Sequence, residues 1–280
     1  MPSLIADRVW CQRSERWQTN TAIVLLDGHA LVCDPSWTPA EIGLIAAFAA
    51  RLGWAGVDLL ITHAHEDHVC GIGAFPEACV LAGPATAAAI EDGSAAAGLV
   101  RAASEWGLEW EGAPFLTRTV PPGELLVRPY RLVAIEAAGH SRDGTAWLLE
   151  EEGVLLCGDY LSAVSAPLAF ASVSGSCATI LRLREVLEQG RATIVVPGHG
   201  PVLTAAEAIA VADADLAYLD VVAGTASAAL AAGLPPGAAI VETWAAAEPS
   251  RPSIADLAVY QARTLNARTA VAEAVDRLRG

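Results

Sequence analysis

Lysine is missing from this 280-residue chain, so that each of its 17 basic residues is an arginine. The 32 acidic residues outnumber them and give a formal net charge of −15 at pH 7. Affinity for nucleic acids rests largely on lysine and arginine side chains that neutralise phosphates. We therefore expect no nucleic-acid partner for this chain.

Long apolar runs are missing as well. No stretch reaches the roughly 18 uninterrupted apolar residues that indicate a membrane-spanning helix, and we expect no membrane contact. Residues 1–8 lack a basic segment followed by an apolar one, so they do not resemble a signal peptide. The six cysteines are scattered without a C-x-x-C pair, which is typical of a cytoplasmic protein whose thiols stay reduced.

Imidazoles, in contrast, are concentrated in one short stretch. Three of the six histidines lie between residues 63 and 68 together with Asp67. The apolar residues 57–61 before them predict a buried strand that ends at this cluster. His63 and His65 can point the same way, whereas Asp67 and His68 follow on the turn and can face a second point. This arrangement suits two metal ions, and its ligand types suit zinc, with iron or manganese as alternatives.

Three further strand ends each deliver one residue of a metal-binding type. His140, Asp159 and His199 all follow short apolar runs. A polar loop with incidental histidines is the alternative interpretation, but it does not explain this repeated placement. The sixth histidine, His29, lies in or just after an Asp-Gly turn, and we expect it at the surface without a ligand role.

The combined motifs H-x-H-x-D-H, a lone His, Gly-Asp and Pro-Gly-His-Gly, in this order, resemble those of the metallo-β-lactamase superfamily. The resemblance covers roughly residues 20–205. It implies that His63, His65 and His140 hold one metal ion, that Asp67, His68 and His199 hold the other, and that Asp159 bridges them. It also implies an α/β (α+β) fold, the four-layer αβ/βα sandwich, with the metal site at one edge.

The rest of the chain predicts how this sandwich is built. Residues 1–280 are expected to form a single domain, with a core of about 1–205 and a helical extension of about 205–280. The extension is either a lid over the site or a dimer surface, and a homodimer is therefore one of two alternatives. Capping boxes predict helix starts at Thr38 and Thr204, and Ser253 is the predicted start of a last helix. Further predicted helices cover residues 86–91 and 178–189, and residues 161–176 are predicted to form a loop that borders the site.

The resemblance implies a dinuclear zinc hydrolase with two zinc ions per chain. A hydroxide that bridges the metals would attack a carbonyl centre, and Asp67 would take a proton from the attacking water. We expect a small acyl substrate, such as a thioester, a lactone or another ester. Alternatives are a persulfide dioxygenase with one iron, a β-lactamase or phosphodiesterase of the same superfamily, and a metal-binding module without catalysis. Trp106, Trp110 and Phe115 are candidates for an apolar wall, and Tyr160 for either a substrate contact or a structural role.

Overall fold

The computed structural model describes residues 1–26, 28–35, 38–51, 56–95, 116–127, 130–249, 251 and 259–279. Several residues with predicted roles lie outside the described residues: Trp106, Trp110 and Phe115 of the expected apolar wall, Asp27 of the hairpin turn, and Ser253 at the expected start of the last helix.

The first of two sheets has seven strands within the described residues, in the order β1-β2-β3-β4-β5-β6-β7. They are β1 (Ser3–Ala6), β2 (Val9–Arg13), β3 (Asn20–Leu26), β4 (His29–Cys33), β5 (Gly56–Ile61), β6 (Cys79–Ala82) and β7 (Leu116–Thr119). Strands β1 to β4 pair antiparallel, whereas β4 to β7 run parallel. The carboxyl ends of the parallel strands therefore meet at one edge of the sheet.

The second sheet has six strands in the described part of the chain, in the order β13-β12-β11-β10-β9-β8. They are β8 (Gly123–Val127), β9 (Tyr130–Glu136), β10 (Thr145–Leu149), β11 (Val154–Leu156), β12 (Ile194–Val196) and β13 (Leu203–Thr204). Only β11 and β12 pair in parallel, and the other neighbours are antiparallel. The carboxyl ends of β11 and β12 therefore point the same way.

Alternating side chains of each strand divide the core into layers. On β5, Leu60 packs between the two sheets, while Leu59 and Ile61 face the helices outside the first sheet. On β10, Trp147 packs between the sheets, while Leu148 faces the helices outside the second. Both faces of each sheet are therefore buried, which explains the continuous apolar runs in these strands.

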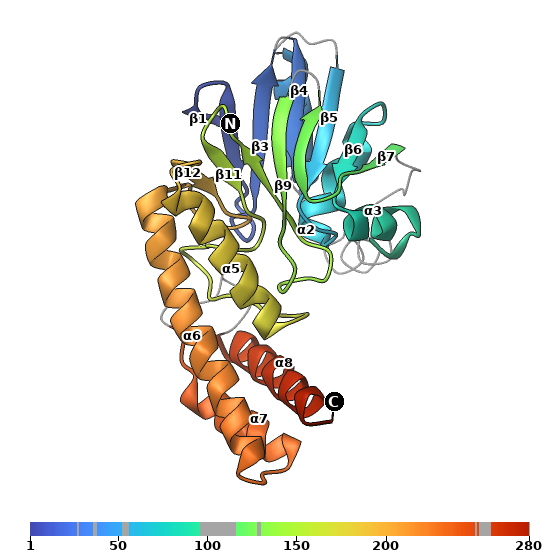
Figure 1. Cartoon of the computed structure of the whole chain (residues 1–280). Coiled ribbons are helices and arrows are strands. Elements are labelled where there is room, and N and C mark those ends of the chain that lie inside the picture. The colour runs from blue at the N-terminus through green and yellow to red at the C-terminus, as the bar shows by residue number, and fades with distance from the viewer. Residues whose placement is uncertain are drawn as a thin grey trace.

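Helices cover the outer faces of both sheets, as Figure 1 shows. On the first sheet lie α1 (Pro39–Arg51), α2 (Glu66–Val69), the 3₁₀ helix η1 (Cys70–Ala74) and α3 (Pro84–Glu91). On the second lie α5 (Val173–Glu188) and α6 (Ala205–Ala231), followed by α7 (Pro236–Ala246) and α8 (Val259–Arg279). This is the predicted four-layer αβ/βα sandwich with a C-terminal helical extension. Within the described ranges, no helix combines the length and apolarity needed to cross a bilayer.

The capping boxes predicted from the sequence are confirmed, but two other predicted helix starts are wrong. Thr204 accepts a hydrogen bond from Glu207 N and caps α6. At the start of α1 the hydroxyl of Thr38 accepts a hydrogen bond from Glu41 N and donates one to Oε2 of Glu41. Helix α5 begins at Val173 instead of residue 178, and α3 begins at Pro84 instead of residue 86. For α5 the reason is Ser172, whose hydroxyl accepts a hydrogen bond from Gly175 N at 2.8 Å and caps the helix earlier.

Candidate metal centre

The candidate ligands come from four loops at one edge of the sandwich. His63 and His65 follow the end of β5, and His140 lies between β9 and β10. Asp159 follows the end of β11, and His199 follows the end of β12. The structure thus brings together the strand ends that the sequence singled out. The remaining two candidates, Asp67 and His68, lie on the short helix α2 directly after β5.

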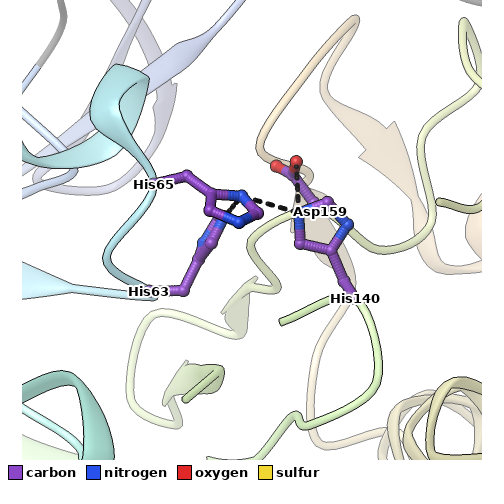
Figure 2. Close-up of side chains that lie close together, drawn as sticks. All are labelled: His63, His65, His140 and Asp159. Atoms are coloured by element: carbon purple, nitrogen blue, oxygen red, sulfur yellow. Dashed lines mark hydrogen bonds and ion pairs between the residues drawn. The ribbon is translucent and has the colours of Figure 1, made fainter. Parts of the chain in front are cut away.

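The first group consists of His63, His65, His140 and Asp159, shown in Figure 2. Nε2 of His63 and Nε2 of His140 each lie 3.0 Å from Nδ1 of His65. Oδ2 of Asp159 lies 3.1 Å from Nε2 of His140. His63 and His140 are buried, whereas His65 is half-buried. Three imidazole nitrogens and one carboxylate oxygen therefore converge on one point.

The second group consists of Asp67, His68 and His199, all buried. Oδ2 of Asp67 lies 3.3 Å from Nε2 of His199 and 3.5 Å from Nε2 of His68. Oδ1 of Asp159 lies 3.2 Å from Nε2 of His199 and 3.1 Å from Nε2 of His68. These atoms surround a second point, which is adjacent to the first.

Asp159 stands between the two groups because its two carboxylate oxygens face different sets of imidazoles. Oδ2 faces His140 of the first group, and Oδ1 faces His68 and His199 of the second. The backbone of Gly198 makes room for this carboxylate, since a Cβ atom at Gly198 would lie only 2.2 Å from Oδ1 of Asp159. A side chain at this position would push the carboxylate out of the cluster.

The residues present fit a metal ion in each group. Four ligands bound tetrahedrally to zinc at about 2.0–2.1 Å lie roughly 3.3 Å apart, close to the spacings of 3.0–3.5 Å between these atoms. Nε2 of His68 and Oδ1 of Asp159 are buried and make no hydrogen bond. A buried polar atom that has no hydrogen-bond partner destabilises the folded protein. A cation between them would satisfy both.

The electrostatics of the cluster agree with this fit. Burial lowers the pKa of His140 to about 4, and it lowers the pKa of His63 well below the usual value, helped by neighbouring imidazoles. Burial acts in the same direction on His68, but three nearby carboxylates outweigh it and raise the pKa of His68. For Asp159 burial is outweighed by the surrounding imidazoles, which hold its pKa well below the usual range. In the second group the negative charge of the carboxylates is therefore balanced by protons on the imidazoles. A metal ion would replace these protons.

A residue that the sequence analysis missed orients the second group. Oδ2 of Asp34 lies 2.8 Å from Nδ1 of His68, so that Nε2 of the same ring faces the cluster. The carboxylate also accepts hydrogen bonds from the backbone N–H and the hydroxyl of Thr62. Such partners fix the orientation and tautomer of a metal-binding imidazole. Asp34 directly follows the buried strand β4, which is the same sequence signal that identified Asp159.

Carbonyl groups orient two further imidazoles. Nδ1 of His140 lies 2.8 Å from the carbonyl oxygen of Leu168, and Nδ1 of His199 lies 2.9 Å from that of Trp17. Because a carbonyl oxygen can only accept, both Nδ1 atoms carry a proton, and the Nε2 atoms are the ones that face the cluster. The hydroxyl of Tyr160 accepts a hydrogen bond from the backbone N–H of His140 at 2.8 Å, which favours a structural role for this residue.

A cavity of about 350 Å³ opens onto the cluster. Its lining includes five of the candidate ligands, namely His65, Asp67, His140, Asp159 and His199. The apolar side chains of the lining are Trp17, Leu161, Ala166, Pro167, Leu168 and Phe170, and those of residues 161–170 form an apolar wall. The predicted loop of residues 161–176 therefore borders the site through residues 161–170, but it ends at Ser172, because helix α5 already begins at Val173. Glu66 of α2 and Asp215 of α6 also line the cavity. Through Asp215 the helical extension reaches the site.

His29 lies apart from both groups, in agreement with the sequence analysis. It begins β4, whereas the cluster lies at the opposite end of that strand, beyond Cys33. Nε2 of His29 lies 3.0 Å from Oδ2 of Asp58, and both side chains are partly exposed.

Comparisons with known proteins agree with this geometry. A profile of the Metallo-beta-lactamase superfamily matches residues 15–199, which end at the last candidate ligand. The hydroxyacylglutathione hydrolase of Rhodopseudomonas palustris (strain BisB18) is 30% identical over 132 residues, which cover 46% of this chain and 44% of that protein. The chain thus matches less than half the length of this relative.

Similar solved structures extend the comparison to the whole fold. The metallo-beta-lactamase family protein TTHA1429 from Thermus thermophilus has a TM-score of 0.63 at 20% identity, over 98% of this chain and 94% of that one. DIM-1 metallo-beta-lactamase has a TM-score of 0.55 at 17% identity, over 76% and 96% of the two chains. TTHA1623, solved in a di-iron-bound form, has a TM-score of 0.56 at 26% identity, over 70% and 95%.

Proposed function

Because the chain belongs to the metallo-β-lactamase superfamily of metal-dependent hydrolases, we propose that it hydrolyses a small acyl substrate at a site for two zinc ions. The observation that carries the proposal is the carboxylate of Asp159, each oxygen of which faces one group of imidazoles. A site for one ion would need only one of these faces. The proposed ligands are His63, His65, His140 and Asp159 for one ion, and Asp67, His68, His199 and Asp159 for the other.

The donor set supports zinc, and the relative in a di-iron form supports iron as the alternative. When bound, two such ions lower the pKa of a water molecule and polarise the carbonyl group that this water attacks. The three orienting hydrogen-bond partners, Asp34 and the carbonyls of Leu168 and Trp17, keep the imidazoles in the orientation that can bind metal.

Asp67 is the residue that we propose to move a proton. Its carboxylate lines the cavity, and Oδ2 accepts a hydrogen bond from the hydroxyl of Thr19 at 3.3 Å. In this position it can take the proton of the attacking water and return it to the leaving group. The chemistry needs no side-chain nucleophile, because water is the attacking group.

The cavity supports an uncharged or weakly polar acyl group as the substrate. Its apolar wall of Leu161, Pro167, Leu168 and Phe170 can bury an acyl chain and exclude bulk water beside the cluster. The acidic side chains of its lining outside the metal groups are Glu66 and Asp215, of which Asp215 pairs with Arg251. The carboxylate of Glu66 repels anions. The similarity to a hydroxyacylglutathione hydrolase supports hydrolysis of a thioester.

A substrate panel with the zinc-loaded protein tests this proposal. It contains aryl esters, thioesters, lactones, bis-aryl phosphodiesters and short RNAs, and a persulfide with an oxygen electrode. We expect the highest kcat/KM for an acyl substrate and no oxygen uptake. The variant Asp159→Ala should lose both the metal ions and this hydrolysis, because its carboxylate contacts both groups.

Two results would overturn the proposal. One is cleavage of a phosphodiester or of RNA with a kcat/KM at least about tenfold above every acyl substrate, which corresponds to roughly 1.4 kcal/mol of transition-state stabilisation. The other is oxygen consumption with the persulfide by a protein that holds one iron ion, which would favour a dioxygenase.

A further inference from the structure

The loop of residues 161–172, called the wall loop below, both lines the cavity and contacts the first ligand group. The carbonyl of Leu168 accepts the hydrogen bond from Nδ1 of His140 at 2.8 Å. The ring of Phe170 packs edge-on against His65 and His140, with centroid distances of 5.6 and 5.2 Å. The position of this loop therefore sets both the orientation of His140 and the shape of the apolar wall.

One side chain of the C-terminal helix α8 holds the wall loop on both sides of Leu168. Oδ1 of Asn266 accepts a hydrogen bond from the backbone N–H of Ala169 at 2.9 Å. Nδ2 of Asn266 donates to the carbonyl of Pro167 at 2.8 Å and to the hydroxyl of Tyr218 at 3.1 Å. Because an N–H must meet Oδ1 and a carbonyl must meet Nδ2, the orientation of this amide is fixed by its partners.

Asn266 is also fully buried, so that water cannot replace these bonds. A buried backbone group that loses its hydrogen-bond partner is destabilising, and the loop would move to recover one. Any such movement shifts the carbonyl of Leu168, which is the hydrogen-bond partner of Nδ1 of His140. The carboxamide is thus connected to the metal centre through a single peptide segment, although it lies 126 residues after His140 in the chain.

We propose that Asn266 is a positioning residue of the metal centre. It fixes the backbone of residues 167–169, and through the carbonyl of Leu168 it keeps the proton of His140 on Nδ1 and leaves Nε2 free. This inference rests on the proposed function to the extent that Nε2 of His140 is a metal ligand. By this route the helical extension controls a ligand group that belongs to the sandwich.

The test compares two variants of Asn266 with a matched control. Asn266→Ala removes all three hydrogen bonds. Asn266→Asp keeps the shape and the acceptor for Ala169 but cannot donate to Pro167, which provides a second variant if the alanine protein does not fold. Tyr218→Phe removes one hydrogen bond of the same amide but leaves both of its hydrogen bonds to the wall loop in place, and it controls for a loss of stability.

Two measurements read the site. Nitrogen-15 NMR of the histidine rings in the metal-free protein identifies the tautomer of His140. Titration with Co²⁺ in competition with a chelator measures the affinity of each metal site. We expect wild type and Tyr218→Phe to show one tautomer, protonated on Nδ1. Both Asn266 variants should show a mixture of tautomers and about 10- to 100-fold weaker binding at one of the two sites, the range found for partners of metal-binding imidazoles.

An unchanged His140 tautomer, or Co²⁺ affinities within about twofold of wild type, in a folded Asn266 variant would overturn the inference. The same conclusion would follow if Tyr218→Phe weakened binding as much as the Asn266 variants. The NMR measurement needs neither metal nor substrate. It therefore tests the role of Asn266 separately from the proposed hydrolysis.

Discussion

Oδ2 of Asp34 lies 2.8 Å from Nδ1 of His68, and both side chains are buried beneath the candidate metal centre. Oδ1 of the same carboxylate accepts a hydrogen bond from the backbone N–H of Thr62 at 2.9 Å. Asp34 therefore joins the end of β4 to the stretch after β5 that carries the first histidines. One carboxylate both positions that backbone and holds the ring of His68.

The variant Asp34→Asn should weaken metal binding at the second group. Asparagine has the same shape and tolerates the backbone of Asp34, whose φ is 49°. Its amide nitrogen would face Nδ1 of His68, so that two donors meet where a donor and an acceptor met before. We expect about 10- to 100-fold lower zinc affinity in a chelator competition. An affinity within about twofold of wild type would show that this contact does not orient His68 for binding.

The strands and the candidate ligands at their ends could be predicted from local patterns, whereas the sandwich was implied by the resemblance to the metallo-β-lactamase superfamily. Apolar runs mark the strands, and histidines or carboxylates follow their ends. Asp34 could have been found by the same rule. The contacts of Asn266 could not, because nothing in the sequence relates a helix position to a loop that lies 97 residues earlier. The early start of α5 was missed because Ser172 caps it without a Glu or Gln at the third helical position.

Phe170 should determine acyl preference. Its side chain is 46% exposed and lies on the apolar wall of the cavity. We expect Phe170→Ala to lower kcat/KM for substrates with a long or aromatic acyl group by about 10- to 100-fold, and to change acetyl substrates much less. The control is Leu181→Ala, which removes an exposed apolar side chain of α5 that is not part of the cavity lining. An equal loss for all acyl lengths would contradict this role.

Asp215 should make the stability of the protein depend on pH. Burial raises the pKa of this carboxyl to about 7, although Arg251, its hydrogen-bond partner, acts in the opposite direction. Between the unfolded value of about 3.9 and this value, the folded state binds a proton that the unfolded state does not. The contribution of Asp215 to stability therefore falls as pH rises through this window, by at most about 1.4 kcal/mol per pH unit.

Urea unfolding of wild type and Asp215→Asn from pH 5 to pH 8 measures this effect, with both proteins in the same metal state. The free energy of unfolding of wild type, relative to the variant, should fall up to about pH 7 and then level off. The comparison cancels the titration of all other groups that the substitution leaves unchanged. A difference that stays flat across this range would show that Arg251 keeps the carboxyl ionised throughout.

His29→Ala should leave metal content and turnover unchanged. The side chain pairs with Asp58 at the end of β4 opposite the cluster, and both partners are partly exposed. Exposed ion pairs contribute about 0–1 kcal/mol, so the loss of stability should be small. Elemental analysis and activity on the best acyl substrate provide the measurement. A loss of metal would mean that the sixth histidine had been assigned wrongly.

The location of bound zinc tests the central claim most directly. Anomalous X-ray diffraction from crystals of the zinc-loaded protein, measured at the zinc edge, locates each ion. We predict two peaks about 3.5–4 Å apart, with Asp159 between them. One peak should lie about 2.0–2.1 Å from ring nitrogens of His63, His65 and His140, and the other at a similar distance from those of His68 and His199. A single peak, or peaks away from Asp159, would contradict the account.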